Sequence, residues 1–381
     1  MGDYKFDLQN YLKELEYLVN IDSGSRNPRG ISKVADFFIK KYLDIGYSVK
    51  THEINEEIGP CLEIENCSSE RYDILLLGHM DTVFEIGTAK ERPFTIIDNR
   101  AYGPGVIDMK SGLLSMYYAL KEIYEKELGK NLSIKIILNS DEEIGSRGSL
   151  GIISRAAVKS NVVFVLEPAR ANGALVLQRK GLGAYDIKFH GIAAHAGVEP
   201  QKGASAITEM GRWIVELNIL NNYKAGTTVN VGIASGGTAR NVVAEEAKIQ
   251  VDLRFKEIAE MNGIDKAIED LISNPIIKGV KVDVNKLGMR PPMNPMDTTM
   301  KIWSIIKEIG HELGIELDWV ATGGGSDANI TASLGVPSID GLGPIGGGAH
   351  GQSEYLEIDS IQPRLEVLKK LILSPKLSRL F

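Results

Sequence analysis

Three short apolar runs in this chain are each followed by acidic or histidine residues. The runs cover residues 73–77, 133–138 and 162–166, and they are followed by His79-Met80-Asp81, Asp141-Glu142-Glu143 and Glu167. Runs of this length and composition predict buried strands. In open α/β sheets, ligands bind beyond the carboxyl ends of the strands, so we expect these side chains to share one crevice. Carboxylates and imidazoles gathered there are typical of a metal site with room for two ions.

Apolar residues at helical spacing predict helices between and around these strands. The predicted helices cover residues 7–18, 31–43, 113–124, 300–313 and 361–373. The second of them is expected to begin after a break at Asn27-Pro28-Arg29-Gly30. Strands that alternate with helices indicate an α/β fold, with a mostly parallel sheet covered by helices.

The pattern changes after Pro168 and predicts a second domain. The chain has 381 residues, which exceeds the usual size of a single hydrophobic core. Strand-like segments at 174–176, 184–189, 227–233 and 247–255 occur among helical segments at 204–220 and 261–271. We interpret residues 175–289 as an inserted α+β domain, and residues 1–174 and 290–381 as the catalytic, metal-binding domain. Thr322–Ser326 and Gly341–Gly348 are expected to be glycine-rich loops.

Charge and hydropathy exclude some classes of function. The net charge is −7 and the pI is near 5.6, which argues against a nucleic-acid partner. No apolar run approaches the roughly 20 residues that span a bilayer, so no membrane partner is expected. The N-terminus lacks the features of a signal peptide, and Cys61 and Cys67 do not have the spacing of a metal-binding pair. We therefore expect a cytoplasmic protein.

The residues after the strands have side chains suited to distinct roles. His79 and Asp81 point the same way in an extended segment, so Asp81 is a candidate acceptor for the second ring nitrogen of a ligating His79. The alternative is a solvated histidine at a strand end. Of the adjacent Glu142 and Glu143, one can ligate a metal while the other serves as general base, although consecutive acids are often only solvated surface.

Two further candidates lie in glycine-rich loops. Asp108 follows Gly103-Pro104-Gly105 and precedes a helix. An aspartate there is commonly a helix cap, but a carboxylate in a tight turn can also bridge two cations through its two oxygens. His350 lies in the loop 346–351, where glycines leave room around the imidazole. A loop histidine that binds nothing is the common alternative.

Taken together, these segments resemble the dinuclear-zinc metallopeptidase family, which contains glutamate carboxypeptidases, aminoacylases and succinyl-diaminopimelate desuccinylase. The resemblance spans nearly the whole chain, and its type is closest to the glutamate carboxypeptidase-like members. The motifs that carry it are residues 77–83, 103–105, 108–112, 141–146, 194–197 and 347–350.

The resemblance implies a complete set of metal ligands. Asp108 would bridge two divalent ions, with zinc as the expected metal and cobalt or manganese as alternatives. His79 and Glu167 would hold one ion, and Glu143 and His350 the other. Glu142 would be the general base, and Asp81 would orient His79. The family also has a cis peptide bond after the bridging aspartate, here Asp108-Met109.

The resemblance also assigns roles to the inserted domain. It would form a lid and the interface of a homodimer, with His195 reaching into the partner's site to stabilise the oxyanion. Asn241 would do similar work. Arg254 and Arg290 are candidates for binding a substrate carboxylate, because a guanidinium matches it bidentately. A surface position in a strand is the alternative for Arg254.

These implications define the expected function. It is hydrolysis of a peptide or amide bond next to a free carboxylate, by attack of metal-bound hydroxide with Glu142 as base. The substrate would be a small peptide or an N-acyl amino acid, so N-acyl-amino-acid deacylase is the alternative activity. A metal-retaining protein without catalysis is a further alternative, but such a protein would be expected to lose Glu142. Glutamate-specific members have a lysine and a serine where this chain reads Gly173-Ala174-Leu175-Val176, so the released residue stays open.

Overall fold

The computed structural model describes residues 6–381, which divide into two compact units. The large unit comprises Met1–Gln178, Asn294–Ala321 and Ser326–Phe381. The inserted unit comprises Arg179–Met293 and Thr322–Gly325. Its main segment begins and ends a few residues later than the segment 175–289 expected from the sequence. The first strand after Pro168, β8 (Leu175–Arg179), pairs with β15 (Trp319–Thr322), and only its last residue belongs to the inserted unit.

The large unit contains a six-stranded sheet that is mostly parallel, as the sequence predicted. Its order is β1 (Ser48–His52), β2 (Cys61–Glu65), β6 (Ile134–Asn139), β3 (Tyr72–His79), β7 (Ser160–Val165) and β16 (Ser338–Ile339). The last four strands are mutually parallel, whereas β2 runs antiparallel to both β1 and β6. All six residues of β6 are buried, including Lys135 and Asn139, as expected for a central strand of a sheet covered on both faces.

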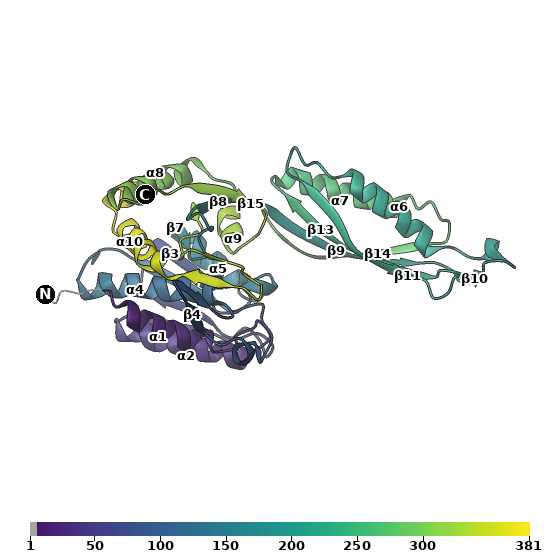
Figure 1. Cartoon of the computed structure of the whole chain (residues 1–381). Coiled ribbons are helices and arrows are strands. Elements are labelled where there is room, and N and C mark those ends of the chain that lie inside the picture. Colours follow the sequence, from purple (N-terminus) through teal and green to yellow (C-terminus); the bar gives the residue numbers. More distant parts are fainter. Residues whose placement is uncertain (1–5) are drawn as a thin grey trace. The chain divides into compact units, whose positions relative to one another are not determined.

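Helices cover this sheet (Figure 1). They are α1 (Leu8–Val19), α2 (Pro28–Asp44), α4 (Ser111–Glu125), α5 (Leu150–Val158), α8 (Asp297–Glu312), α9 (Ala328–Ser333) and α10 (Ile361–Ile372), with the short α3 (Thr88–Glu91) and α11 (Pro375–Ser378). Helix α4 packs on β3 and against α10, and α5 packs on β7 and against α9. These α/β layers confirm the predicted fold class.

Helix α2 begins earlier than the sequence pattern indicated. The prediction treated residues 27–30 as a break before the helix, but α2 starts at Pro28. Proline is favoured at the first helical position, because its fixed φ suits the helix and its missing N–H is not needed there. The Asn27 side chain caps this end by accepting the N–H of Gly30 at 3.2 Å.

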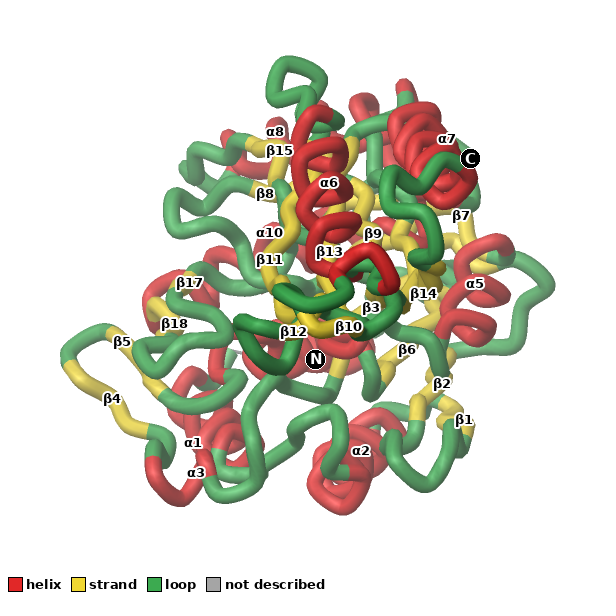
Figure 2. The backbone as a smooth tube through the Cα atoms, turned by 90° about the vertical axis from the view of Figure 1, so that its right-hand side faces the viewer, coloured by secondary structure: helices red, strands yellow, loops and turns green. Residues whose placement is uncertain are grey.

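A small antiparallel sheet that the sequence analysis did not predict brings two distant loops together. Its order is β17 (Gly346–Gly347), β18 (Tyr355–Glu357), β5 (Arg100–Tyr102) and β4 (Thr95–Ile97), and Figure 2 shows these strands next to one another. The pairing of β18 with β5 places the loop 348–354 beside the loop that follows β5.

The inserted unit is a four-stranded antiparallel sheet with two helices on one side (Figure 1). The order is β11 (Thr228–Gly236), β13 (Glu246–Phe255), β9 (Gly181–His190) and β14 (Lys281–Arg290), and the helices are α6 (Ala206–Ile219) and α7 (Ile258–Ser273). Alternate residues of β9 and β13 are buried in a core that includes Trp213 and Phe189. A separate pair of two-residue strands is formed by β10 (Ala194–His195) and β12 (Val242–Val243).

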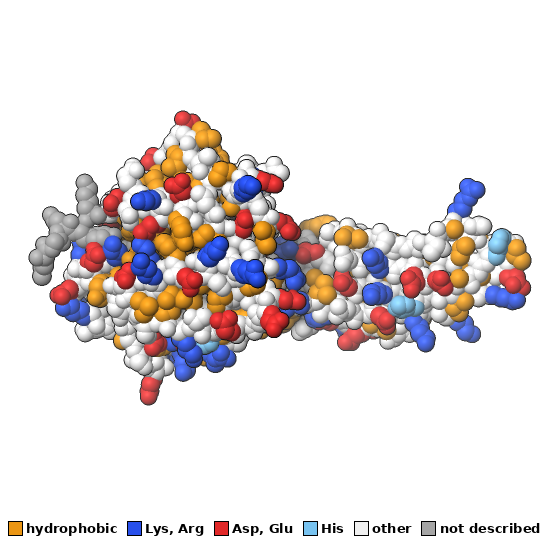
Figure 3. Space-filling model, turned by 90° about the horizontal axis from the view of Figure 1, so that it is seen from below, with side chains coloured by type: hydrophobic (Ala, Val, Ile, Leu, Met, Phe, Trp, Pro, Cys, Tyr) orange, Lys and Arg blue, Asp and Glu red, His pale blue; other side chains and the backbone are white. Residues whose placement is uncertain are grey.

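Two surface properties bear on function. Within residues 6–381, no helix combines the length and apolar character needed to cross a membrane. Figure 3 shows basic and acidic side chains interspersed on the face that it draws.

Candidate metal centre

The predicted ligands come from five separate segments of the large unit. His79 is the last residue of β3, Glu143 lies in the helical turn Glu142–Ile144 after β6, and Glu167 follows β7. Asp108 lies in the tight turn Val106–Lys110 before α4, and His350 lies between β17 and β18. The structure brings these five side chains together at the carboxyl ends of the parallel strands.

Asp108 lies between two histidines. Its Oδ1 is 3.2 Å from Nε2 of His79, and its Oδ2 is 3.2 Å from Nε2 of His350. The peptide bond that follows, Asp108-Met109, is cis, as expected from the family resemblance. Each carboxylate oxygen of Asp108 therefore faces a different imidazole.

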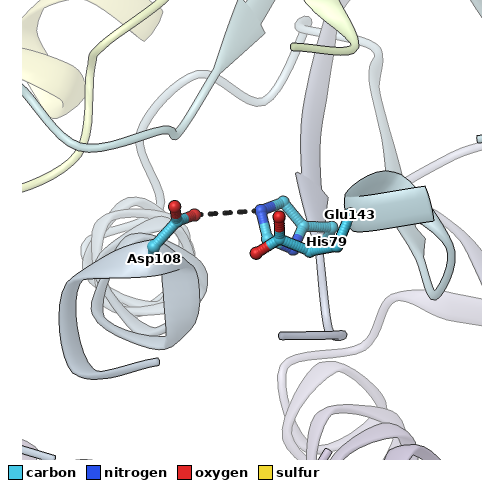
Figure 4. A group of neighbouring side chains, drawn as sticks. All are labelled: His79, Asp108 and Glu143. Atoms are coloured by element: carbon cyan, nitrogen blue, oxygen red, sulfur yellow. Dashed lines mark hydrogen bonds and ion pairs between the residues drawn. The ribbon is translucent and has the colours of Figure 1, made fainter. Parts of the chain in front are cut away.

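Each histidine is close to one further carboxylate. Nε2 of His79 is 3.6 Å from Oε1 of Glu167, and Nε2 of His350 is 3.2 Å from Oε2 of Glu143. The ligand atoms of His79, Asp108 and Glu143 all lie within 4.8 Å of one another (Figure 4). The side chains therefore form two sets of donors, each with one imidazole and one carboxylate, and both sets share Asp108.

The donors fit a divalent metal. Oε1 of Glu143 is buried and finds no hydrogen-bond partner among residues 6–381. Buried polar atoms are normally satisfied, so this oxygen indicates a ligand site rather than a structural contact. Imidazole and carboxylate together are donors that suit zinc and related ions, whereas calcium prefers oxygen donors alone.

The electrostatics of the cluster also favour cations. Burial raises the pKa of Glu143, and it raises the pKa of Glu167 well above its usual range. Burial opposes ionisation of Asp108 too, but hydrogen bonds from His350 and His79 hold its pKa well below its usual range. Hydrogen bonds to Asp108 and Glu143 raise the pKa of His350 to about 10. Carboxylates clustered with little exposure to solvent therefore favour compensating positive charge.

Asp81 orients more of the site than the sequence suggested. His79 Nδ1 is 2.9 Å from the main-chain oxygen of Asp81 and 3.4 Å from its carboxylate. When Nδ1 carries the proton and donates it to this oxygen, Nε2 is free to bind a metal. The buried Asp81 carboxylate accepts the backbone N–H groups of Glu142 and Glu143, both at 3.2 Å, and the hydroxyl of Ser25 at 2.7 Å. It thus fixes the turn that carries the predicted base and its neighbour.

Glu354 is a site residue that the sequence analysis missed. Its buried carboxylate accepts three backbone N–H groups, from Gly105 at 2.9 Å, Ile107 at 3.0 Å and Asp108 at 3.1 Å. Glu354 therefore holds the turn that presents Asp108 and ties it to the loop that carries His350. The available signal was an acid four residues after His350, immediately before the strand-like Tyr355 and Leu356.

The other predicted residues belong to the inserted unit. His195 is exposed in β10 opposite Val242, and the main-chain oxygen of the neighbouring Asn241 accepts the N–H of Ala196 at 2.9 Å. His195 and Asn241 therefore lie close together in that unit.

The two candidate arginines differ in their surroundings. The guanidinium of Arg254 is paired with the carboxylate of Asp252, at 2.9 and 3.0 Å, and it also donates to the main-chain oxygen of Gly323 at 3.3 Å. A substrate carboxylate at Arg254 would therefore compete with Asp252. Arg290 is the last residue of β14 and lies opposite Leu182.

This fold and cluster define a hydrolase with a carboxylate–histidine metal centre. Residues 75–374 match the model of peptidase family M20/M25/M40, and the chain belongs to this family. It is accordingly a metallopeptidase-type enzyme, as the sequence predicted.

Proteins named for several different activities are similar to this chain. The chain is 29% identical to carboxypeptidase G2 of Pseudomonas sp. (strain RS-16) over 369 residues, which cover 95% of this chain and 88% of that protein. It is 24% identical to acetylornithine deacetylase of Proteus mirabilis (strain HI4320), over 86% of each chain. The fold is similar to that of aminopeptidase PepT from Bacillus cereus, with a TM-score of 0.80 and 23% identity over 98% of this chain and 99% of that chain.

Proposed function

We propose that this protein hydrolyses an amide bond next to a free carboxylate with the help of two divalent ions, zinc being the expected metal. The observation that carries the proposal is the position of Asp108, whose two oxygens face two separate imidazole–carboxylate sets. His79 and Glu167 would hold one ion, and Glu143 and His350 the other. When bound, such ions polarise a carbonyl and lower the pKa of water.

The residues around the ligands suit general-base catalysis. Glu142 adjoins Glu143, and Asp81 fixes the backbone of both through two hydrogen bonds. Glu142 would take the proton of the attacking water and deliver it to the leaving amine. His195, exposed in β10, would stabilise the oxyanion in the partner's site, with Asn241 assisting.

The test of this mechanism is Glu142→Gln, which keeps the shape of the side chain and removes its basicity. Turnover of a cleaved dipeptide or N-acyl amino acid should fall by at least about 100-fold. Metal content, measured by elemental analysis, should be unchanged. Glu56→Gln, on the exposed surface, is the control and should match the wild type. Near-normal turnover of Glu142→Gln would remove this residue from the mechanism.

The substrate class is the second part of the proposal. Carboxypeptidase G2 and acetylornithine deacetylase are both similar to this chain, so a screen should contain dipeptides and N-acyl amino acids. Arg254 and Arg290 are the candidates for binding the free carboxylate, and at Arg254 the substrate would compete with Asp252. Arg290→Ala should mainly raise KM for the free acid. If the wild type cleaves an amidated substrate as well as the free acid, the proposed binding of the substrate carboxylate by an arginine is wrong.

A homodimer through the inserted unit is also proposed. β11 is an edge strand of its sheet, so its outer backbone groups are available for pairing. Large hydrophobic side chains beside this edge are exposed, with Ile233 on β11 at 54% and Val215 and Ile219 on α6 at 60% and 68%. Helix α6 packs on β11, so these side chains belong to adjacent elements. Sedimentation equilibrium should give twice the chain mass, and Ile219→Asp should shift it toward the monomer.

The cytoplasm is the proposed location. Cys61 is buried and Cys67 exposed, and both are free thiols. Free thiols suit a reducing compartment.

A further inference from the structure

A cavity of about 370 Å³ lies beside the candidate metal centre in the large unit. It is lined by residues 24–27 and 82–86, together with Glu143 and Ile144. Glu143 belongs both to the cavity wall and to the ligand cluster. Ser25, another wall residue, donates its hydroxyl to Asp81 at 2.7 Å. The cavity is therefore continuous with the groups that would handle the scissile amide.

Three large hydrophobic side chains in the wall are exposed. Val83 is 41% exposed, Ile86 is 73% exposed and Ile144 is 38% exposed. Single exposed apolar side chains are common on protein surfaces, but three around one cavity next to candidate reactive groups indicate a ligand-binding surface.

The walls of the cavity are held in place before any ligand binds. Thr82 accepts the N–H of Ser25 at 3.2 Å and donates to the main-chain oxygen of Ser23 at 2.9 Å. The guanidinium of Arg92 lies 4.8 Å from the centre of the Phe84 ring and donates to the main-chain oxygen of Gln352 at 2.9 Å. The segment 82–86 is thus fixed both to residues 23–25 and to the loop that follows His350.

The charges around the cavity argue against an anionic ligand group. Among the lining residues other than Glu143, which is a proposed metal ligand, Arg26 is cationic and Glu85 is acidic. The Arg26 guanidinium is 3.5 Å from the carboxylate of Glu57, and its side chain is 74% exposed. A substrate carboxylate would therefore compete with Glu57 for Arg26, whereas an uncharged apolar group needs no such partner.

We propose that this cavity binds the acyl side of the substrate, and that the group it accepts is apolar, such as a phenyl or isobutyl group. The inference rests on the proposed amide hydrolysis. A substrate carboxylate here would compete with Glu57 for Arg26, so the cavity is assigned to the part of the substrate without a carboxylate. Benzene fits a protein cavity of about 150 Å³, so a phenyl ring fits here with room to spare. Val83 and Ile86 would set the specificity.

Direct binding tests the cavity without turnover. Phenylacetate and acetate share a carboxylate and differ in the phenyl ring. Calorimetric titration of the zinc-loaded wild type should give a Kd at least about 10-fold lower for phenylacetate, in line with burial of one apolar group. The double variant Val83→Asn/Ile86→Asn should lose most of this preference. Ile97→Asn, at an exposed isoleucine in β4 outside the cavity, should retain it.

Turnover then tests the substrate side. The ratio of kcat/KM for the N-phenylacetyl and N-acetyl derivatives of one amino acid should fall by about 10-fold in the double variant and stay constant in Ile97→Asn. An equal loss for both substrates, or no phenylacetate preference in the wild type, would overturn the assignment of the cavity. If the wild type cleaves neither derivative nor any dipeptide, the proposed function fails, while the calorimetric comparison still decides whether the cavity binds an apolar group.

Discussion

Replacement of Glu354 should damage the metal centre through the backbone rather than through a lost ligand. Its Oε2 accepts the N–H of Gly105, and its Oε1 accepts the N–H groups of Ile107 and Asp108. The bonds from Gly105 and Ile107 are buried, and the bond from Asp108 is partly buried. Glu354→Gln keeps one oxygen, which in the Oε1 position preserves two of the three bonds. Glu354→Ala removes all three.

The expected loss of stability follows from this count. An unsatisfied buried N–H costs about 1–3 kcal/mol, so Glu354→Gln should lower the free energy of unfolding by about 1–2 kcal/mol. Glu354→Ala should lower it by about 3 kcal/mol, which is the lower limit for three lost bonds. The expected loss of stability stays at this lower limit because burial raises the pKa of Glu354 to about 7. The buried carboxylate therefore opposes folding at neutral pH, and its removal offsets part of the loss. Zinc affinity should fall by about 10–100-fold, as for other groups that orient a ligand.

Two measurements check this prediction. Urea unfolding in EDTA gives the stability of the metal-free protein, and calorimetric titration gives the zinc affinity. Glu357→Gln is the matched control, because Glu357 lies in the same segment but pairs with Arg100 near the surface, 2.7 Å away. If Glu354→Ala unfolds at the same urea concentration as this control and binds zinc as tightly as the wild type, the hydrogen bonds to Glu354 have no role in positioning Asp108.

Three further predictions concern acid stability, metal removal and the dimer. Burial acts against ionisation of Glu63 and Glu65, but hydrogen bonds from Lys135 to Glu63, and from Tyr72 and Lys135 to Glu65, lower the pKa of both. Because these folded-state pKa values are lowered, the stabilisation is present above the unfolded value of 4.5 and is lost as the pH falls below it. The difference in Tm between wild type and Lys135→Met should therefore be largest at neutral pH and should shrink in acid. EDTA should lower the Tm, since bound metal stabilises only the folded chain, and an unchanged Tm would contradict a tight site. Verified mixed dimers of His195→Ala and Glu142→Ala chains should recover up to about half of wild-type activity by the counting of complete sites, and dimers as inactive as either parent would place His195 outside the partner's site.

The sequence was informative where one strand carries both the fold and the chemistry. The apolar run before His79 predicts a buried strand, and the residue after such a strand must lie at the crevice. The same logic holds for Glu143 and Glu167. The apolar pattern of each strand and the position of the residue after it were sufficient to predict these site residues, because neighbouring parallel strands end at one edge of the sheet.

The pairing of distant loops could not be predicted in this way. Whether His350 approaches Asp108 depends on the pairing of β18 with β5, two three-residue strands far apart in the chain. Strands this short have no readable period. Glu354 was missed for the same reason, because its acceptor role depends on backbone N–H groups that belong to the other loop. The strand β14 was missed as well, because none of its residues is fully buried and its register shifts between Lys286 and Gly288.

The distance along the chain between the two histidines has a consequence for biosynthesis. His79 is translated early and His350 late, and Glu354 is translated later still. A nascent chain that has passed Glu167 already carries one proposed donor set and the shared Asp108, but it lacks the second imidazole and the carboxylate that holds the Asp108 turn. Prematurely terminated chains would therefore lack part of the proposed ligand set and could not complete the proposed metal centre.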